Sequence, residues 1–346
     1  MNEGVRFLWL KTPGYKSNIS RMYNMIYFAI SACYGRGIRS LEKPDVILGS
    51  SPQLFGAYAG QRLAARFRVP FILEIRDIWP QSLVDLSNVP RYHPVIQALE
   101  ILENYLYSKA TRIISLLPGG SEYLVRKGIP KEKISWLPNG IDTRYIPKSA
   151  FPQNGTVFSV MYAGAHGIAN GLQTILDAAT ILQQEGWGER VRFRLVGDGP
   201  VKPFIQKRAH NEGIKIIDFN NPVPKEKVYD VLREADAFVM ILKRSAVFRW
   251  GVSPNKLFDY MVSARPTIFS VNAPFDPVSA AKAGIIIPPE DPHALAQAIR
   301  QLADMPLQER YEMGLRGRNY VEKHHNTTKL AIKLEDILLE TLASPI

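Results

Sequence analysis

The chain has 346 residues, of which 46% are hydrophobic and 22% are charged, and it is long enough for two ordinary globular domains. Its single cysteine, Cys33, excludes a disulfide framework and a multi-thiolate metal site, and a small buried hydrophobe is the ordinary role for such a residue. No apolar run approaches the roughly 20 residues of a membrane span, and the start lacks a signal-peptide pattern. We therefore expect a cytoplasmic protein.

The net charge of +11 is unevenly distributed. Residues 1–150 contain 20 basic and 11 acidic side chains, whereas residues 151–346 contain 23 and 21. A basic first half favours an anionic partner such as lipid head groups, a phosphorylated acceptor or nucleic acid, and a merely solubilising surface is the alternative. The basic residues are scattered and accompany no nucleic-acid-binding signature, so nucleic acid is disfavoured.

In the first half, short apolar runs alternate with longer amphipathic stretches, which is the pattern of a parallel sheet covered by helices. Strands are predicted at residues 5–10, 45–49, 70–75, 112–117 and 134–137, and helices at 53–66 and 94–108. Residues 22–34 form an apolar and aromatic stretch that is flanked by Lys16, Arg21, Arg36, Arg39 and Lys43. This stretch is either a core helix or a helix that lies on an anionic membrane surface.

The alternation restarts after a segment rich in Pro, Gly and Asn at residues 147–156. Strands are predicted at residues 158–162, 191–196, 214–219, 237–241, 266–270 and 285–287. Two such arrays predict an α/β protein with two doubly wound, Rossmann-like domains and a ligand cleft at the carboxyl ends of the strands. We expect domains at 1–147 and 148–326, and a C-terminal helix at 327–346 that packs back on the first domain.

Three segments of the second half contain the candidate site. Residues 158–172 run from a strand through Gly164 and Gly167 into a helix, where bare backbone and unpaired N–H groups can approach a phosphate. Residues 196–200 are a tight turn in which Gly197 can admit a nucleotide and Asp198 can stabilise its own turn. Either segment can also be an ordinary strand-to-helix turn.

Residues 251–261 are the most informative segment. Ser253 suits the cap of a helix and Pro254 its first turn. Lys256 and Asp259 are three residues apart and share one helix face, where an ammonium group suits a diphosphate and a carboxylate suits ribose hydroxyls. A surface ion pair between Lys256 and Asp259 is the alternative.

Together these segments resemble the retaining GT-B glycosyltransferases (group 1, family 4), and most closely the bacterial O-antigen and capsule transferases of N-acetylfucosaminyl and related amino sugars. Almost the whole chain shares the resemblance. It rests on five ordered blocks, PDVILGSSP at 44–52, EIRDIWP at 74–80, LPNGID at 137–142, GDGP at 197–200 and SPNKLFDYM at 253–261.

The resemblance implies specific roles for residues. The turn from Gly164 to Gly167 faces the diphosphate and the sugar, Lys256 neutralises the leaving diphosphate, Asp259 holds the ribose, and Asp77 lies near the acceptor. Val223 lies by the uracil. His166 joins Asp77 and Lys256 as a candidate catalytic residue, with a buried or capping histidine as the alternative. The remaining nucleotide-sugar contacts implied are Gly197, Asp198, Gly251, Ser253 and Asn255.

The implied reaction moves an N-acetylated amino or deoxy sugar from UDP, with retention, to a saccharide that is linked to a lipid diphosphate, as in lipopolysaccharide or capsule synthesis. It requires no metal and no cofactor other than the UDP-sugar itself. The protein is then expected at the inner face of the cell membrane. A UDP-sugar 2-epimerase and an inactive fragment are the alternatives.

Four features depart from the family pattern. Gly251 stands where the first acid of the family's E-x7-E motif is usual, and Arg76 where many relatives have a histidine. His166 and Asn170 replace the usual Arg and Lys after the first strand of the second half. A strand, glycine-rich turn, helix and second strand usually precede the equivalent of Val5, so the first domain is expected to be truncated.

Overall fold

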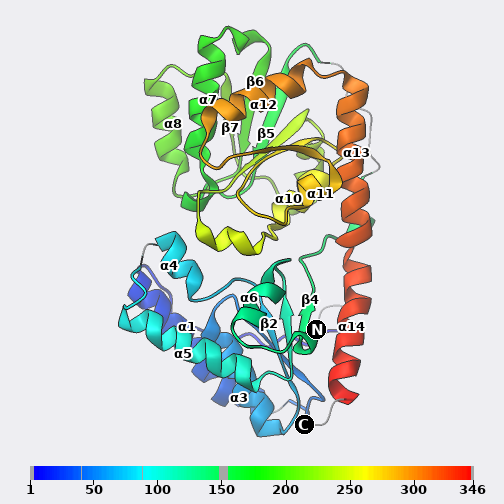
Figure 1. The fold of residues 1–346 in the computed structure, drawn as a ribbon. Coiled ribbons are helices and arrows are strands. Elements are labelled where there is room, and N and C mark those ends of the chain that lie inside the picture. The colour runs from blue at the N-terminus through cyan, green and yellow to red at the C-terminus, as the bar shows by residue number, and fades with distance from the viewer. Residues whose placement is uncertain (1–3, 40, 88, 148–154, 344–346) are drawn as a thin grey trace. The chain divides into compact units, whose positions relative to one another are not determined.

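The computed structural model describes residues 4–39, 41–87, 89–147 and 155–343. Its chain divides into two compact units, Met1–Pro138 with Ala331–Ile346, and Asn139–Leu330. Each unit contains a parallel sheet with helices packed on it, as Figure 1 shows. The α/β class and the two domains built on parallel sheets, as predicted from sequence, are therefore confirmed.

The sheet of the first unit has four parallel strands in the order β1-β2-β3-β4. Their bounds are β1 Ile47–Ser50, β2 Phe71–Ile75, β3 Arg112–Ser115 and β4 Ile134–Trp136. The centre of the sheet is built from β-branched and leucine side chains such as Ile72, Leu73 and Ile113, all of which are at most 1% exposed. Such apolar runs are typical of strands that helices cover on both faces.

The strand predicted at residues 5–10 is wrong. No named strand includes these residues, and the side chains of Phe7 and Trp9 are 59% and 88% exposed. An apolar run predicts burial, but a strand also needs a neighbouring strand for its backbone hydrogen bonds, and the sequence does not specify one.

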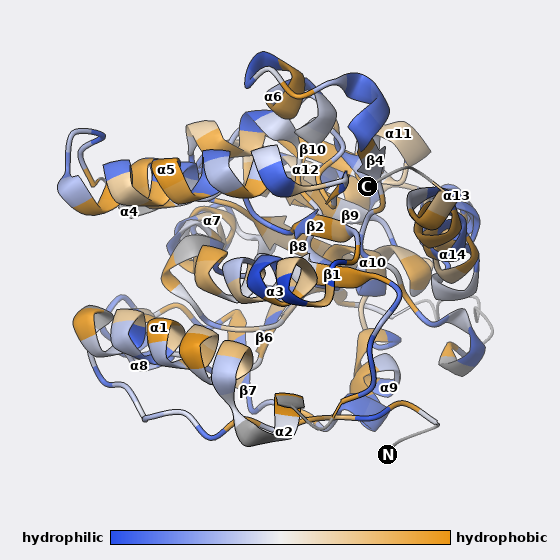
Figure 2. Cartoon of the chain, turned by 90° about the horizontal axis from the view of Figure 1, so that it is seen from below, coloured by the Kyte–Doolittle hydropathy of each residue, from blue (hydrophilic) through white to orange (hydrophobic). Residues whose placement is uncertain are grey.

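Helices cover this sheet and connect its strands. They are α1 Asn18–Tyr34, α2 Arg36–Arg39, α3 Leu54–Phe67, α4 Gln81–Ser87, α5 Pro94–Lys109 and α6 Gly120–Arg126, with a 3-10 turn at Lys131–Lys133. Helix α3 packs on β1, β2, α1 and α5 and is central to the unit. Hydrophobic and hydrophilic residues alternate along α3 and α5, as expected for helices with one buried face (Figure 2).

The last helix, α14 Thr327–Ala343, begins in the second unit and ends in the first. Its final turns are held on the first unit by an ion pair between Arg112 and Glu340, with 2.9 Å between nitrogen and oxygen. Lys333 also lies over the ring of Trp136, 5.6 Å from its centre. The compact division thus falls at Pro138 and Ala331, rather than at the expected 147 and 327.

The second sheet has six parallel strands in the order β10-β9-β8-β5-β6-β7. Their bounds are β5 Phe158–Ala163, β6 Val191–Val196, β7 Ile217–Asn220, β8 Ala237–Ile241, β9 Thr267–Ser270 and β10 Gly284–Ile287. The chain builds outward from β5 to β7 and then returns to β8 on the other side of β5. This reversal is a topological switch point, and in open α/β sheets ligands bind at the carboxyl ends of the strands beside it.

The helices of this unit are α7 Leu172–Gln184, α8 Lys202–Asn211, α9 Val228–Leu232, α10 Asn255–Val262, α11 Pro277–Ala281, α12 Pro292–Asp304 and α13 Leu307–His324. Short 3-10 turns lie at Thr143–Tyr145, Ile168–Asn170, Trp187–Glu189, Lys225–Lys227 and Ala246–Trp250. Two buried clusters fill the faces of the sheet, one centred on Phe193 and Leu176, the other on Phe238 and Tyr260. These clusters hold the ends of β5 and β6 and the start of α10, which form the site.

Candidate nucleotide-sugar site

A cavity of about 380 Å³ lies at the carboxyl ends of β5 and β6 in the second unit. Its walls are the two glycine turns after these strands, one apolar face of α9, and the first turns of α10. The lining residues are Ala163, Gly164, Ala165, Val196, Gly197, Asp198, Pro222, Val223, Val228, Val231, Leu232, Lys256 and Asp259. The sequence predicted six of them, which are Gly164, Gly197, Asp198, Val223, Lys256 and Asp259.

The two glycine turns are bound directly to each other. The N–H of Gly164 donates to the carbonyl of Val196, and the N–H of His166 donates to the carbonyl of Asp198. Gly197 has φ of +141°, and a Cβ there would collide with the carbonyl oxygen of Gly164. Only glycine fits this position, and the contact leaves bare backbone on the cavity wall.

Tyr260 fixes the end of β5. Its hydroxyl accepts from the N–H of Ala163 at 2.8 Å and donates to the carbonyl of the same residue at 2.7 Å. Tyr260 is 1% exposed and stacks on Phe238, with 4.4 Å between the ring centres. Helix α10 is thereby held against the first glycine turn, with Lys256 and Asp259 of its opening turns on the cavity wall.

Lys256 has neutral partners. Its ammonium donates to Oδ1 of Asn170 at 2.6 Å and to the hydroxyl of Tyr162 at 2.9 Å, and it lies 4.8 Å from the centre of the Tyr162 ring. Burial lowers the pKa of Lys256 to about 8. A half-buried ammonium with neutral partners is suited to an incoming anion.

Asp259 lies one helical turn further along the same face and accepts a hydrogen bond from the hydroxyl of Tyr229 at 2.9 Å. Burial raises the pKa of the Asp259 carboxyl, while the Tyr229 hydrogen bond and the charge of Lys225 oppose the shift. In the described part of the chain, no ion pair joins Asp259 to Lys256, which the alternative interpretation required. The charge of each side chain is therefore not neutralised by the other, and both can bind a ligand.

The opposite wall is apolar. Pro222 and Val223 follow β7, and Val228 and Val231 come from α9. A flat, weakly polar group such as a nucleobase suits such a wall, with polar groups at its edge for orientation. The structure thus brings together an apolar wall, a carboxylate, an ammonium and exposed backbone.

His166 is fully buried behind the first turn and does not line the cavity. Among the described residues neither of its ring nitrogens has a hydrogen-bond partner, and its ring centre is 5.9 Å from that of Tyr162. Burial lowers the pKa of His166, and the charge of Lys202 adds to this effect. The imidazole is therefore neutral near pH 7, and its catalytic role stays a prediction.

Ser253 does not cap α10, contrary to the sequence prediction. The helix begins at Asn255 after Pro254 without a side-chain cap, because the Ser253 hydroxyl instead accepts from the N–H of Asn139 at 3.2 Å. The side chain of Asn139 also donates to the Ser253 carbonyl at 2.6 Å. The segment LPNGID at 137–142, one of the five family blocks, is thus bound through Asn139 to the start of the site helix.

The other predicted contacts have local structural roles or lie outside the cavity. Oδ1 of Asp198 accepts from the N–H of Gly199 at 2.8 Å, which is the turn-stabilising alternative, although Asp198 also lines the cavity. Gly167 precedes the turn Ile168–Asn170, and Gly251, with φ of +89°, follows the turn Ala246–Trp250. Gly167, Gly251, Ser253 and Asn255 do not line the cavity.

Asp77 belongs to the first unit, in the loop that follows β2. Its side chain reaches solvent, yet desolvation by the surrounding protein raises the pKa of its carboxyl, and the neighbouring Arg76 charge partly opposes this shift. A carboxylate at the carboxyl end of a parallel strand with a raised pKa is a reasonable proton acceptor. Its role as a catalytic group stays a prediction.

The roles of Tyr162, Tyr229 and Tyr260 were not predictable from the sequence. Tyr162 belongs to a run of apolar strand residues, and Tyr229 is 30 residues from Asp259, so no local spacing marks either of them. In the sequence, Asn170 stands out only as a departure from the family pattern. The contacts of these residues depend on tertiary structure, which a one-dimensional pattern does not contain.

A switch-point cavity lined by two glycine turns, an ammonium and a carboxylate, in the second of two Rossmann-like domains, suits a nucleotide sugar. Residues 1–140 match the family "Glycosyl transferase 4-like domain", and residues 158–305 match "Glycosyl transferases group 1". The chain belongs to the group 1 glycosyltransferases, which have the two-domain GT-B fold.

One curated relative and two solved structures are similar to this chain. The chain is 23% identical over 326 residues to the putative colanic acid biosynthesis glycosyl transferase WcaI of Escherichia coli K12, a match that covers 88% of this chain and 78% of that protein. Its fold is similar to that of sucrose-phosphate synthase from Thermosynechococcus elongatus, with a TM-score of 0.74, 16% identity, and coverage of 96% and 81%. It is also similar to Anabaena Alr3699/HepE in complex with UDP-glucose, with a TM-score of 0.65, 12% identity, and coverage of 95% and 84%.

Proposed function

We propose that the protein transfers a sugar from a UDP-sugar to a saccharide acceptor during synthesis of a bacterial surface polysaccharide such as O-antigen or capsule. Lys256 and Asp259 lie on one face of α10, opposite the two glycine turns, and this placement is the observation that carries the proposal. UDP-glucose in the similar HepE structure and the colanic acid assignment of the similar WcaI support it.

The site suggests how the donor is held. The carboxylate of Asp259 accepts hydrogen bonds from the ribose hydroxyls, the base packs on Val223 and α9, and the diphosphate lies between Lys256 and the backbone of Gly164 and Gly197. In the reaction the bond between the anomeric carbon and the diphosphate oxygen breaks, and Lys256 stabilises the negative charge that develops on the leaving diphosphate. One preorganised donor of this kind is typically worth about 3 kcal/mol in the barrier.

The acceptor hydroxyl attacks from the side on which the diphosphate leaves, so the anomeric configuration is retained. The hydroxyl proton passes either to Asp77 or to an oxygen of the leaving diphosphate. No cluster of three or more His, Cys, Asp or Glu residues in the described part of the chain is arranged to hold a metal ion. We propose that Lys256 and backbone N–H groups neutralise the diphosphate without a metal, and that the sugar is an N-acetylated amino or deoxy sugar.

The test is a transfer assay with purified protein, a panel of UDP-, GDP- and dTDP-sugars, and polyprenyl-diphosphate-saccharide acceptors. We expect transfer from a UDP-amino sugar that persists in EDTA and is lost in Lys256→Ala. A 2-epimerase would instead convert the UDP-sugar without any acceptor, so a donor-only incubation distinguishes the two enzymes. Lack of binding to every nucleotide sugar would refute the proposal.

We further propose that the first unit acts at an anionic membrane surface. In the described residues no helix has the length and apolarity to cross a bilayer. Helix α1 buries Ala29, Ala32 and Cys33 against α3, yet it exposes an apolar stripe at helical spacing. The exposed stripe consists of Ile19, Tyr23, Ile26, Tyr27, Ile30 and Tyr34, which are between 37% and 79% exposed.

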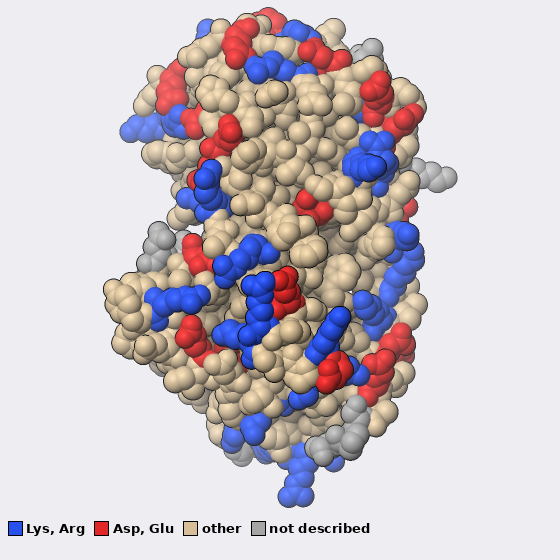
Figure 3. Space-filling model, viewed as in Figure 1, with Lys and Arg blue, Asp and Glu red and all other residues tan. Residues whose placement is uncertain are grey.

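Charge supports a membrane as the occupant of this stripe. Lys16, Arg21 and Lys43 are exposed near α1 in the sequence, and the first half of the chain carries most of the net positive charge. On the face drawn in Figure 3, Lys and Arg side chains gather over the first unit. Aromatic side chains beside basic ones suit the head-group layer, where each basic residue contributes about 1 kcal/mol.

Sedimentation with liposomes tests this part of the proposal. Binding is expected to increase with the fraction of anionic lipid, to decrease as salt rises, and to be lost in Tyr23→Glu. The contrary outcome is that the protein fails to bind vesicles at every salt concentration while Tyr23→Glu improves its solubility. In that case the stripe is a surface covered by protein rather than lipid. That outcome would leave the glycosyltransferase proposal intact.

A further inference from the structure

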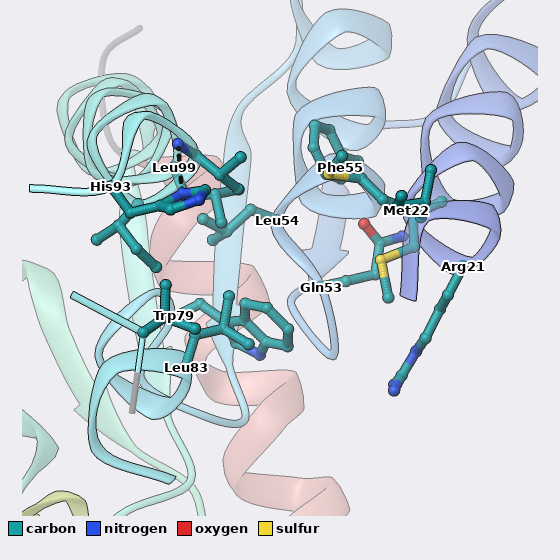
Figure 4. Close-up of a pocket in the computed structure, with 14 residues that line it drawn as sticks. Arg21, Met22, Gln53, Leu54, Phe55, Trp79, Leu83, His93 and Leu99 are labelled. Atoms are coloured by element: carbon teal, nitrogen blue, oxygen red, sulfur yellow. Dashed lines mark hydrogen bonds between the residues drawn. The ribbon is translucent and has the colours of Figure 1, made fainter. Parts of the chain in front are cut away.

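The first unit contains a second cavity, of about 500 Å³, which the sequence did not indicate. It is bounded by α1, α3, α4, α5 and the loop after β2 (Figure 4). Its lining is mostly aliphatic, thioether and aromatic, with Met22, Leu54, Phe55 and Leu99 among the members. The volume lies within the range of small-molecule sites, which is roughly 300–1,000 Å³.

The strongly polar side chains that line the cavity are few, namely Arg21, Gln53 and His93. Gln53 caps α3, where its Oε1 accepts from the N–H of Gly56 at 3.0 Å. Arg21 extends from α1 beside the opening (Figure 4), and its guanidinium takes part in none of the ion pairs found among the described residues. The Nδ1 of His93 already has a hydrogen-bond partner within its own segment, because it accepts from the N–H of Val95 at 3.2 Å. A sugar or nucleotide would find few partners for its many hydroxyls here, and burying it would leave polar groups unsatisfied.

The cavity also reaches the loop after β2, which contains Asp77, the candidate proton acceptor. Trp79 lines it from the loop after β2, and Asp77 lies two residues earlier in the same loop. On the other side, Ile19 belongs both to the cavity lining and to the exposed apolar stripe of α1. An apolar path thus runs from the proposed membrane face to the loop that contains the candidate base.

We infer that this cavity binds the hydrocarbon chain of a lipid-phosphate acceptor, with Arg21 paired to the phosphate. The inference rests on the proposed function, because it names the class of acceptor that the transferase would use. An apolar lining with one cation at the opening complements a molecule with an apolar tail and an anionic head. Each methylene buried should increase affinity about fourfold, so affinity should depend strongly on chain length.

The experiment is calorimetry on the full chain with water-soluble probes below their aggregation concentration. Farnesyl diphosphate has a long branched chain and dodecyl phosphate a long linear one. Butyl phosphate has a short chain, and inorganic pyrophosphate, which has none, tests the anion alone. Saturating UDP is present throughout, so that a diphosphate cannot occupy the Lys256 site. Binding is expected for the two long-chain probes, at least tenfold weaker binding for butyl phosphate, and none for pyrophosphate.

Three variants locate the binding. Met22→Glu places a negative charge in the lining at a position that is 37% exposed, so the fold should tolerate it, and affinity should fall at least tenfold. Arg21→Gln should weaken dodecyl phosphate about tenfold and leave dodecanol unchanged, because only the phosphate requires the cation. Ile30→Glu is the matched control, on the same helix but outside the cavity, and should not affect these soluble probes.

The outcomes separate this inference from the proposed function. The cavity inference is overturned if UDP binds and the long-chain probes do not. It is also overturned if Met22→Glu binds dodecyl phosphate as tightly as the unchanged protein does. In both cases the glycosyltransferase proposal stands. If the chain probes bind as expected but no nucleotide does, the cavity inference holds and the proposed function fails. Equal loss in Met22→Glu and Ile30→Glu would indicate adsorption on α1 and would also overturn the inference.

Discussion

The ammonium nitrogen of Lys256 lies 2.6 Å from Oδ1 of Asn170, so a neutral amide holds the only cation that lines the nucleotide cavity in the described residues. The amide nitrogen of Asn170 donates in turn to the carbonyl of Ala165 at 2.9 Å, which fixes the orientation of Oδ1. A family member with Lys at this position would have two cations here. This protein has one cation and a partner that positions it.

Replacing Lys256 by Ala should weaken UDP binding by roughly 1.5–3 kcal/mol, about tenfold to 150-fold, because a charged hydrogen bond to the diphosphate is lost. Asn170→Ala should have a smaller effect on UDP affinity and a larger one on the transfer rate, since the ammonium remains but is no longer held. Calorimetry with UDP and steady-state kinetics measure the two effects. Unchanged affinity in Lys256→Ala would mean that the diphosphate binds elsewhere.

UDP affinity should also depend on pH. The pKa of Lys256 is about 8 in the free protein, so raising the pH above this value removes the charge that attracts the diphosphate. The dissociation constant is expected to increase up to about tenfold per pH unit between pH 8 and 10, because bound diphosphate favours the protonated lysine. Lys256→Arg should give a flat profile over this range. A steep profile in that variant would assign the titration to another group.

Asp259→Asn should weaken UDP by about 1.5–3 kcal/mol and should affect UMP and uridine as strongly, because the loss concerns the ribose and not the phosphates. Tyr229→Phe removes the hydrogen bond to Asp259 and should give a smaller loss of the same kind. Asp218→Asn, which breaks an exposed ion pair with Arg192 in the same unit, serves as the control and should not change binding. A loss confined to UDP, with normal uridine binding, would contradict the ribose assignment.

Gly197→Ala should destabilise the second unit by about 2–4 kcal/mol, because the added methyl collides with the backbone of Gly164 in a conformation that alanine rarely adopts. Gly186→Ala is the matched control. It also has positive φ, at +83°, but nothing lies within 4 Å of the added Cβ, so a loss of only about 1 kcal/mol is expected. Urea unfolding followed by circular dichroism compares the two, and equal losses would mean that the turns are not in close contact.

His166→Leu should separate a structural from a catalytic histidine. Burial lowers the pKa of His166, so below pH 6.5 the unfolded chain binds a proton that the folded chain does not. The free energy of unfolding therefore decreases as the pH is lowered. Leucine removes two buried unpartnered nitrogens, so stability at pH 7 should be retained and the decrease between pH 6.5 and 5 should be smaller. Transfer activity decides the role, since normal activity in a stable His166→Leu protein would exclude catalysis.

The sequence by itself determined the class of fold and part of the site. Apolar runs of strand length, separated by amphipathic helices, are enough to specify a parallel sheet, because each run must be buried on both faces. Gly197, Lys256 and Asp259 were also predictable, since a bare turn and two charges on one helix face are local properties of the chain. These signals depend on residues within a few positions of one another.

Tertiary structure alone decided the remaining features. The residues at 5–10 have the composition of a strand but form no named strand in the part of the chain that the structure describes. Ser253 is of a residue type that often caps helices, but it bonds to Asn139, 114 residues away in the sequence. The partners of Lys256 and Asp259, and the cavity between α1, α3 and α5, depend on segments that are distant in the chain and meet only after packing. Hydrogen-bond partners and cavities are properties of three-dimensional proximity, which the local pattern of side chains does not encode.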